Sequence, residues 1–324
     1  MKTVLLTGAS GFIGSNVLKA LVKDSDVNVR ILVRAEIERN TQFSEFIGDI
    51  RDRGSVRKAV QGADVVIHLA AFARMWSRDP IEFEQINVDG TRNVIEAAQE
   101  YGVGRVVFAS SMSIFEPASE IQTESNLKYR DHQITPYSIS KWKAEMLLDS
   151  ARLRGLDVVI VYPTRVFGPG PLTDANAAAV ALLRYRRGRL PLIDGGRQMS
   201  NWAFVRDVAD GVIMAAFSGK PNNRYILGGE NRTLADLLKI LRGIEKVGFR
   251  PINISRDMAM KIARIEEFRA KLFNSKPFVT PEWLEMVLEN SSCDIMKAVN
   301  DLNYRATPIE EALRETMNLV QIHG

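Results

Sequence analysis

Two side chains that can move protons lie close together in the sequence. Tyr137 and Lys141 are four residues apart near the start of a predicted helix, Pro136–Arg154, and residues at this spacing share a helix face. An ammonium group beside a phenol favours the phenolate and lowers the tyrosine pKa, which makes tyrosine a usable proton donor and acceptor. The spacing therefore predicts a tyrosine acid/base with a lysine partner. With seven tyrosines in the chain, one such pair also arises easily by chance.

A run of hydroxyl side chains precedes this pair. The predicted strand Arg105–Ala109 leads directly into Ser110, Ser111 and Ser113. The carboxyl end of a central parallel strand faces the crevice in which such sheets bind ligands. A hydroxyl there could hydrogen-bond a carbonyl oxygen and stabilise negative charge on it, although serines at a strand end also simply form turns.

A glycine-rich turn lies at the start of the chain. Residues 7–14 read T-G-A-S-G-F-I-G, between a predicted strand, Thr3–Thr7, and a predicted helix, Phe12–Lys23. Glycines let the backbone approach a pyrophosphate, and free N–H groups at a helix N-terminus stabilise its charge. The turn predicts a dinucleotide site. A glycine turn without a ligand is the alternative, which the position between strand and helix disfavours.

The end of the second predicted strand indicates which dinucleotide is bound. An acidic residue there prefers NAD, whereas a basic residue accommodates the 2′-phosphate of NADP. Here the strand Asn28–Val33 is followed by Arg34, with no Asp or Glu before Glu36. We therefore predict NADP(H) in preference to NAD(H), with Arg34 on the 2′-phosphate. An ordinary surface arginine is the alternative.

Alternating strands and helices that would position these groups fill the first half of the chain, as in repeated βαβ units with a parallel sheet. The predicted strands are Thr3–Thr7, Asn28–Val33, Glu45–Gly48, Asp64–Leu69, Arg105–Ala109 and Asp157–Tyr162, and the predicted helices are Phe12–Lys23, Ser55–Gln61, Ile81–Tyr101 and Pro136–Arg154.

The pattern changes after residue 167, at the rigid break Gly168-Pro169-Gly170-Pro171. Beyond it, a strand is predicted at Arg224–Leu227 and helices at Ala175–Arg187, Val205–Ser218, Thr233–Gly243, Met258–Phe273, Pro281–Glu289 and Pro308–Val320. We expect an α/β fold with a Rossmann-type doubly wound parallel sheet in residues 1–167, to which 200–227 return. A smaller, mostly helical substrate-binding region would occupy residues 168–324.

Composition excludes several classes of protein. The 324 residues are 46% hydrophobic and 25% charged, as in a folded chain of about two domains. One cysteine and three scattered histidines predict no metal site. No apolar stretch approaches the ~18 residues of a membrane span, and Met1–Gly8 lacks the features of a signal peptide. We expect no membrane partner and a cytoplasmic location.

The charge is mild, with 43 basic and 39 acidic residues and a net charge of +4. A short basic cluster, residues 184–189, comes without a nucleic-acid recognition motif. We therefore expect a small-molecule substrate and no nucleic acid.

Together, the motifs resemble those of extended short-chain dehydrogenases/reductases, the NAD-dependent epimerase/dehydratase superfamily. In family order they are the glycine turn at 7–14, Gly48-Asp49-Ile50, His68-Leu69-Ala70-Ala71, Asn87-Val88-Asp89-Gly90-Thr91, Ser110-Ser111, Tyr137 to Lys141, Pro163 through Gly170, and Val205-Arg206-Asp207-Val208-Ala209. The match spans about residues 1–230, and the remainder matches loosely.

The resemblance implies a role for each catalytic residue. Tyr137 would be the acid/base, and Lys141 would bind the nicotinamide ribose and depress the pKa of Tyr137. Ser111, placed by its distance from Phe115, would polarise the substrate oxygen, with Ser110 and Ser113 as alternatives. Hydride would pass between nicotinamide C4 and a substrate carbon. The family's members often dimerise, so a homodimer is expected.

The cofactor-binding set follows from the glycine turn, from Arg34 and from the resemblance. Asp49 and Ile50 would contact the adenine, while Pro163 and Val166 would wall the nicotinamide. Asn87 would order the elements beneath the site, and His68 is expected to be a hydrogen-bonded core histidine. The full predicted set is Gly8, Gly11, Phe12, Ile13, Gly14, Arg34, Asp49, Ile50, Leu69, Ala70, Ala71, Tyr137, Lys141, Pro163 and Val166.

Two substrate classes stay open. The resemblance favours the branch of dihydroflavonol reductases and hydroxysteroid dehydrogenases, for two reasons. The stretch Ser200-Asn201-Trp202 lacks the arginine with which sugar-nucleotide enzymes hold a diphosphate, and Arg34 favours NADP. The leading prediction is a carbonyl reductase or alcohol dehydrogenase. Arg165 and the cluster at 184–189 could bind a diphosphate by another route, so a sugar or nucleotide-sugar epimerase or dehydratase is the alternative. A non-catalytic dinucleotide-binding protein is a third reading.

Overall fold

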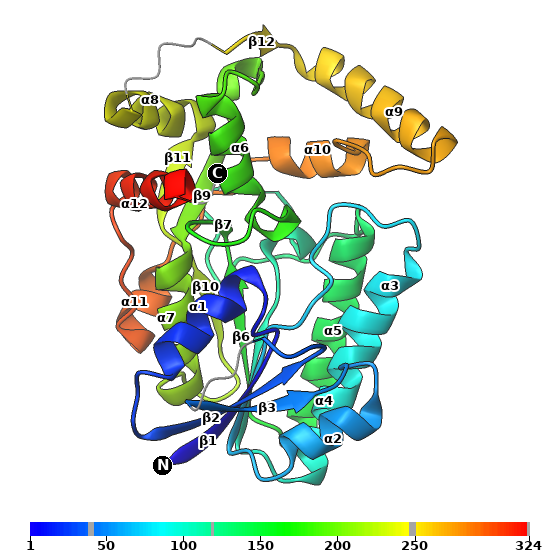
Figure 1. The fold of residues 1–324 in the computed structure, drawn as a ribbon, viewed down its shortest axis with the longest axis vertical. Helices are drawn as coiled ribbons and strands as arrows, with labels where there is room; N and C mark the ends of the chain where they lie inside the picture. The colour runs from blue at the N-terminus through cyan, green and yellow to red at the C-terminus, as the bar shows by residue number, and fades with distance from the viewer. Residues whose placement is uncertain (38–41, 118–119, 246–250, 323–324) are drawn as a thin grey trace.

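Seven parallel strands form the large sheet of the protein (Figure 1). The computed structural model describes residues 1–37, 42–117, 120–245 and 251–322. The strands are β1 (Lys2–Thr7), β2 (Val27–Val33), β3 (Phe43–Ile47), β4 (Val65–His68), β5 (Arg105–Ala109), β6 (Val158–Pro163) and β10 (Arg224–Leu227). Their order, β10-β6-β5-β4-β1-β2-β3, contains the doubly wound order 3-2-1-4-5-6. The predicted α/β fold class is confirmed.

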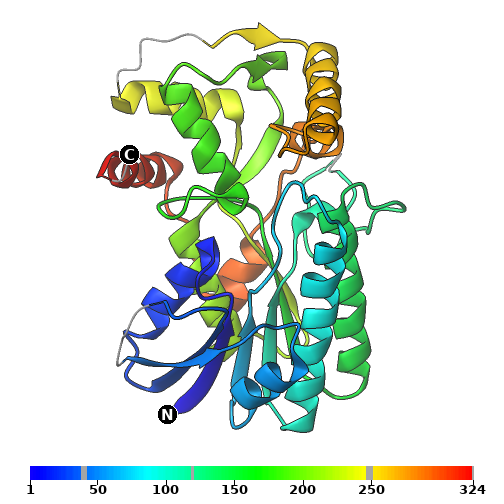
Figure 2. The same ribbon diagram turned by 45° about the vertical axis from the view of Figure 1, so that its right-hand side comes forward.

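Helices cover both faces of this sheet, as the two ribbon views show (Figures 1 and 2). One face packs against α1 (Phe12–Leu21), α7 (Val205–Phe217) and α11 (Met296–Leu302). The other packs against α2 (Arg53–Val60), α4 (Gly90–Glu100) and α5 (Pro136–Leu153). Central strands are therefore buried on both sides, which explains why they read as continuous β-branched runs.

The expected helix Ile81–Tyr101 is divided in three. It begins as α3 (Ile81–Phe83), continues as a π-helical stretch at Glu84–Asp89, and becomes α4 at Gly90. The π-helical stretch contains Asn87, whose side chain donates to the Ser140 hydroxyl on α5 at 2.8 Å. Such a widened turn often marks a functional site, and no apolar periodicity predicts it.

The second half contains strands that the sequence did not predict. β7 (Arg165–Phe167), β9 (Met199–Phe204) and β11 (Glu230–Thr233) form a three-stranded sheet, and β8 (Leu192–Ile193) pairs with β12 (Asn253–Ile254). β9 was missed because polar Ser200 and Asn201 are buried within it, hydrogen-bonded rather than exposed.

Helices α6 (Ala177–Arg186), α8 (Leu234–Glu245) and α12 (Ile309–Ile322) pack on the three-stranded sheet. Helices α9 (Arg256–Leu272) and α10 (Pro281–Leu288) pack on each other, next to β8 and β12. In the described part of the chain, no helix is long and apolar enough to cross a membrane, and no three His, Cys, Asp or Glu side chains group as metal ligands. The domain boundaries at residues 167 and 168 stay a prediction.

The turn between β1 and α1 packs directly against the end of β4. Gly8 has a φ of +77°, and a Cβ built on it would lie 2.6 Å from the Ala70 nitrogen. A Cβ on Gly14 would lie 2.0 Å from the Gly8 carbonyl oxygen. Both contacts involve rigid backbone, so no side chain fits at either position.

We expect Gly14→Ala to lower the free energy of unfolding by about 1–3 kcal/mol, because the added methyl group forces β1 and α1 apart. Gly243→Ala is the matched control. Gly243 lies in α8 with nothing within 4 Å of its built Cβ. Its replacement should raise the free energy of unfolding by up to about 1 kcal/mol through helix propensity. Urea unfolding of both variants measures this difference; equal effects would contradict the close approach.

Candidate active site

A cavity of about 520 Å³ opens at the carboxyl ends of the large sheet's central strands. Its base is the glycine turn after β1 and the segments that follow β4, β5 and β6, and its upper wall comes from α6, α10 and the chain around residues 289–293. This place, beside the point where the strand order reverses between β1 and β4, is where doubly wound sheets bind ligands.

The glycine turn fits a pyrophosphate. The absence of side chains at Gly8 and Gly14 lets the backbone form a cradle, and α1 begins after Gly11 without a side chain that caps its N-terminus. Its first N–H groups are thus left for an anion. The residues present fit a bound dinucleotide.

Most of the predicted site residues line this one cavity. They are Gly8, Gly11, Phe12, Ile13, Gly14, Leu69, Ala71, Ser111, Tyr137, Lys141, Pro163 and Val166.

Four predicted cofactor residues lie away from the cavity lining. Ala70 donates its backbone N–H to the Thr7 hydroxyl at 3.2 Å, and Ile50 is buried in the core. Asp49 forms an ion pair with Arg51 at 2.8 Å. The hydrogen bond from Arg51 lowers the pKa of Asp49, and the charge of exposed Arg34 contributes in the same direction. Because Val33 of β2 pairs with Ile47 of β3, the segments that carry Arg34 and Asp49 leave the sheet side by side.

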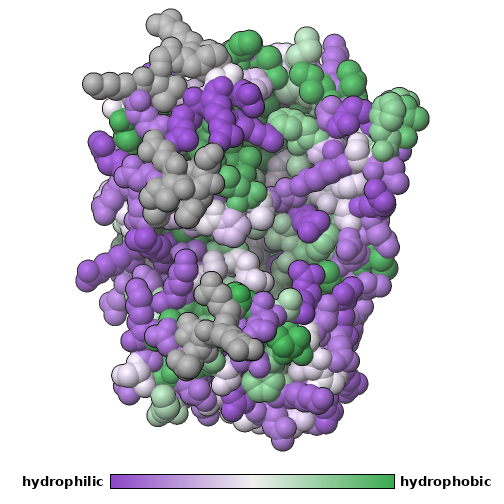
Figure 3. Space-filling view, in the orientation of Figure 1, coloured by the Kyte–Doolittle hydropathy of each residue, from purple (hydrophilic) through white to green (hydrophobic). Residues whose placement is uncertain are grey.

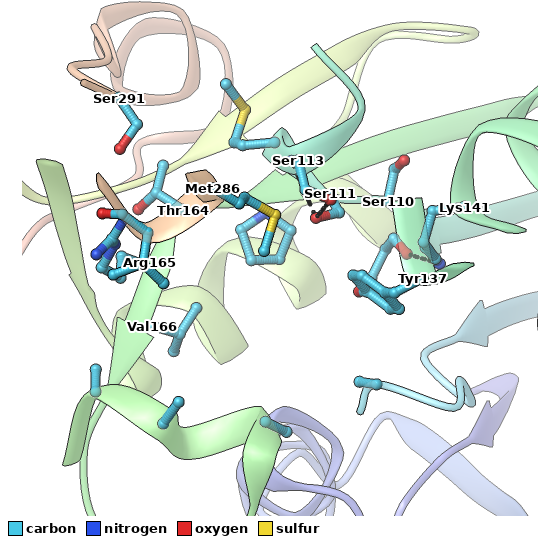
Figure 4. A pocket seen from close by; sticks show the side chains of 18 of the residues that line it. Ser110, Ser111, Ser113, Tyr137, Lys141, Thr164, Arg165, Val166, Met286 and Ser291 are labelled. Carbon is cyan, nitrogen blue, oxygen red and sulfur yellow. Dashed lines mark hydrogen bonds between the residues drawn. The ribbon is translucent and has the colours of Figure 1, made fainter. Parts of the chain in front are cut away.

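Tyr137, Lys141 and Ser111 meet at the base of the cavity (Figure 4). Burial raises the pKa of Tyr137 to about 12, and a hydrogen bond with Ser111 acts in the opposite direction. Burial lowers the pKa of Lys141 to about 7, against the charge of Glu145, which raises it. The Lys141 ammonium donates to the Ala109 carbonyl at 2.6 Å. The predicted effect of Lys141 on the pKa of Tyr137 stays a prediction.

Glu145 anchors this part of α5 and was not predicted. It lies four residues after Lys141 and is fully buried. Its carboxylate accepts hydrogen bonds from Ser110 at 2.7 Å, from Tyr129 at 2.7 Å and from Tyr162 at 2.6 Å, and Arg224 lies 3.3 Å away. The spacing Tyr137-Lys141-Glu145 was the signal that could have found it.

The serines therefore have different surroundings. Ser110 donates its hydroxyl to Glu145, on the side of the core, whereas the hydroxyls of Ser111 and Ser113 lie 2.8 Å apart in the cavity (Figure 4). Of the three serines, Ser110 already donates its hydroxyl proton to a carboxylate.

Asn87 and His68 support the site from behind. Asn87 accepts from the Phe72 N–H at 2.6 Å and donates to Ser140, which in turn donates to the Tyr137 carbonyl at 2.8 Å. It thereby ties the segment after β4 to the first turn of α5. Its expected ordering role agrees with these contacts.

His68 is a neutral core histidine, as expected. Thr91 donates to the Asn87 carbonyl at 2.6 Å, so it accepts from His68 Nε2 at 3.0 Å. Thr7, which accepts from Ala70, donates to His68 Nδ1 at 2.7 Å. Burial, with the charge of Lys141, lowers the pKa of His68 to about 3.

The upper part of the cavity is largely apolar and holds one unusual cation. Its apolar side chains include Met112, Trp202, Trp283, Met286 and Val287. Among them, Arg165 donates to the Val287 carbonyl at 3.2 Å and stacks over Trp202 at 5.4 Å. Burial lowers its pKa to about 10, and no ion pair involves it among the residues the structure describes. The α10 residues were missed because the sequence gives no signal for which helix closes the cavity.

Two distant segments are joined to form one wall of the cavity. The Gln122 N–H donates to the Ser292 carbonyl at 2.9 Å, and the Asp294 N–H donates to the Gln122 carbonyl at 2.8 Å. Arg130 pairs with Glu289 in the same region. The loop after β5 and the chain after α10 therefore form a single structural unit.

The doubly wound sheet, with a glycine cradle and a tyrosine, lysine and serine at its switch point, defines a class of NAD-dependent enzymes that includes epimerases, dehydratases and reductases. The chain belongs to the NAD-dependent epimerase/dehydratase family, whose model matches residues 4–228. The resemblance expected from the motifs is confirmed.

Relatives within the family have different activities. A putative dihydroflavonol 4-reductase of Synechocystis is 30% identical over 98% of this chain and 94% of its own. The crystal structure of the protein gox2253 superposes with a TM-score of 0.83 at 29% identity, covering 100% of this chain and 99% of that one. The UDP-glucose 4-epimerase of Thermus thermophilus, solved with NAD, has a TM-score of 0.75 at 25% identity and covers 98% and 99%.

We expect the free energy of unfolding to fall as the pH drops below the pKa of histidine in the unfolded chain. His68 takes up a proton on unfolding, whereas its buried imidazole stays neutral in the folded protein. The pKa of His68 is about 3 in the folded protein against an ordinary value of 6.5, so the unfolded chain binds more protons than the folded one between these two pH values. At about pH 5.5 this costs about 1 kcal/mol relative to about pH 7.5.

His68→Asn should remove this part of the pH dependence while lowering stability at every pH, as urea unfolding at the two pH values would measure. His132→Asn, at an exposed position, is the control and should leave the slope unchanged. An unchanged slope in His68→Asn would contradict the neutral buried imidazole.

Proposed function

We propose that the protein is an NADP(H)-dependent oxidoreductase that interconverts a carbonyl and an alcohol, with Tyr137 as the acid/base. The observation that carries this proposal is the meeting of Tyr137, Ser111 and Lys141 in the same cavity as the glycine cradle. Full-length similarity to a putative dihydroflavonol 4-reductase supports the same activity.

The proton chemistry follows from the surroundings of Tyr137. A phenol whose pKa is about 12 is protonated at neutral pH, so it is ready to donate to the oxygen of a bound carbonyl. Ser111, which lines the same cavity as Tyr137, lies where its hydroxyl can donate to the same oxygen and stabilise negative charge there. In the oxidative direction Tyr137 takes the proton back. The nicotinamide, when bound, supplies or accepts the hydride.

Lys141 has two tasks in this scheme. Its ammonium is held by the Ala109 carbonyl and lies 3.9 Å from the centre of the Phe108 ring. From there it binds the nicotinamide ribose and favours the phenolate form of Tyr137 after proton transfer. Gly8, Gly11, Phe12, Ile13 and Gly14 hold the pyrophosphate through their backbone.

We assign the NADP preference to the charges beyond β2. Arg34 and Arg51 are both exposed, the Asp49 carboxylate is paired to Arg51, and the charge of Arg34 helps to lower the pKa of Asp49. A 2′-phosphate adds charge that two guanidinium groups can bind, whereas the engaged Asp49 is less free to accept from a ribose hydroxyl.

The second candidate function is a sugar or nucleotide-sugar epimerase or dehydratase. Arg165 favours it, since an arginine without a carboxylate partner in the described part of the cavity could hold a diphosphate. Similarity to the Thermus epimerase fits this reading too. Nicotinamide absorbance separates the two: net NADPH consumption with a carbonyl panel supports the reductase, and sugar interconversion without consumption supports the epimerase. Tight dinucleotide binding with neither would indicate a non-catalytic protein. A homodimer and a cytoplasmic location stay predictions.

We expect Tyr137→Phe to lower turnover by about 100-fold or more, since general acid catalysis typically contributes 10²–10⁴-fold. The affinity for NADPH, measured by fluorescence titration, should stay within about twofold. Tyr101→Phe, at the end of α4, is the control and should retain full turnover. Retained turnover in Tyr137→Phe would remove Tyr137 as the proton carrier.

We expect Arg34→Ala to weaken NADPH binding by about tenfold, as loss of a charge-assisted hydrogen bond at an exposed site implies. NADH binding should not change, because NADH lacks the 2′-phosphate. Titration of both dinucleotides against both proteins measures this, with exposed Arg154→Ala as the control. Equal NADPH and NADH affinities in the unmodified protein would refute the assignment.

A further inference from the structure

Helix α9 buries its small side chains and exposes its large ones. Ala259, Ala263 and Ala270 are buried against the protein. The large apolar side chains of the opposite face are between 42% and 69% exposed; they are Met258, Ile262, Ile265, Phe268 and Leu272. A surface helix of a soluble domain normally has the reverse arrangement, and contiguous exposed apolar residues mark an interaction site. We call these five residues the α9 stripe.

The charges around the α9 stripe are mainly positive. Arg256, Lys261 and Arg264 are exposed on this helix, whereas exposed Lys271 is paired with Glu267. The acidic residues Glu266 and Glu267 are half-buried and already paired, Glu266 with Arg269 at 2.9 Å and Glu267 with Lys271 at 2.8 Å. Asp257, in the first turn, is the exposed acidic residue of this helix. The exposed surface of α9 is thus apolar and cationic.

This helix lies over the wall of the cavity. In Figure 1, α9 runs along the upper edge of the molecule next to α10, and Figure 3 shows apolar side chains on that part of the surface. Ala259 and Ala263 of α9 pack on Leu284 and Leu288 of α10. The same α10 supplies Trp283, Met286 and Val287 to the cavity. A surface that covers α9 would therefore adjoin the apolar part of the site.

The charges argue against a second copy of this chain as the partner. A two-fold dimer places the same patch of each subunit against its copy. Two surfaces with the same excess of exposed cations, Lys261 and Arg264 among them, would then face each other, with the neighbouring Glu266 and Glu267 already paired within their own chain. An anionic lipid surface matches both properties of α9, because the acyl chains accept apolar side chains and the headgroups attract lysine and arginine.

We propose that α9 docks the protein on an anionic lipid bilayer, lying in the plane of the interface with the α9 stripe facing the acyl chains. The expectation of no membrane partner rested on the absence of a spanning segment, which a docked surface helix does not need. This inference does not depend on the proposed activity, and its test needs no substrate.

The test is cosedimentation of the full chain with vesicles. We expect the protein to pellet with vesicles of phosphatidylcholine and phosphatidylserine, to pellet less with phosphatidylcholine alone, and to be released by high salt. Ile265→Ser together with Phe268→Ser should weaken binding at least about tenfold, because two large apolar side chains no longer enter the interface. Both positions are exposed, so circular dichroism should show an unchanged fold.

Matched controls separate apolar and charge effects. Leu153→Ser with Ile81→Ser replaces two exposed apolar residues elsewhere, 91% and 49% exposed, and should leave vesicle binding unchanged. Lys261→Glu with Arg264→Glu should abolish the preference for phosphatidylserine. Failure of the unmodified protein to pellet with anionic vesicles would overturn the proposal. So would equal binding by Ile265→Ser/Phe268→Ser, or a dimer, seen by light scattering, that these two substitutions dissociate.

Discussion

The structure depends on a contact between backbones where β1, α1 and the end of β4 meet. Gly8 lies against Ala70, and Gly14 against Gly8, at distances that leave no room for a Cβ. This contact brings the carboxyl ends of two adjacent strands together with the N-terminus of a helix. The cradle for a pyrophosphate is therefore a consequence of close packing, and the same residues that let the fold form also create its binding site.

The catalytic side chains depend on a second constraint, the row of side chains on α5. Tyr137, Lys141 and Glu145 repeat every four residues, so the helix presents a phenol, an ammonium and a carboxylate along one side. Glu145 is fully buried yet surrounded by donors, including Tyr162. A buried charge with satisfied hydrogen bonds fixes the position of its helix, because any shift would leave the carboxylate unpaired.

Local signals predicted the large sheet and the base of the site. The β-branched strands, the glycine turn and the Tyr137 to Lys141 spacing are all encoded within a few residues. The rest depends on contacts between distant segments. Strand β9 was not predicted because it contains the polar residue Asn201. The buried amide of Asn201 donates hydrogen bonds to backbone carbonyls far along the chain. The hydrogen-bond and charge partners of Glu145 lie on a loop and on two strands. Arg165 has no carboxylate partner in the described part of the cavity because of the helix that closes this cavity. No short pattern records such partners.

The wall shared by the loop after β5 and the chain after α10 has an evolutionary consequence. Its halves lie more than a hundred and fifty residues apart, yet Gln122 exchanges backbone hydrogen bonds with Ser292 and Asp294, and Arg130 is paired with Glu289. The backbone bonds are independent of sequence, but the Arg130–Glu289 pair is not. Replacing either residue of this pair alone leaves a charge on the cavity wall without its partner, so a hybrid of two relatives keeps the pair when both stretches come from the same parent.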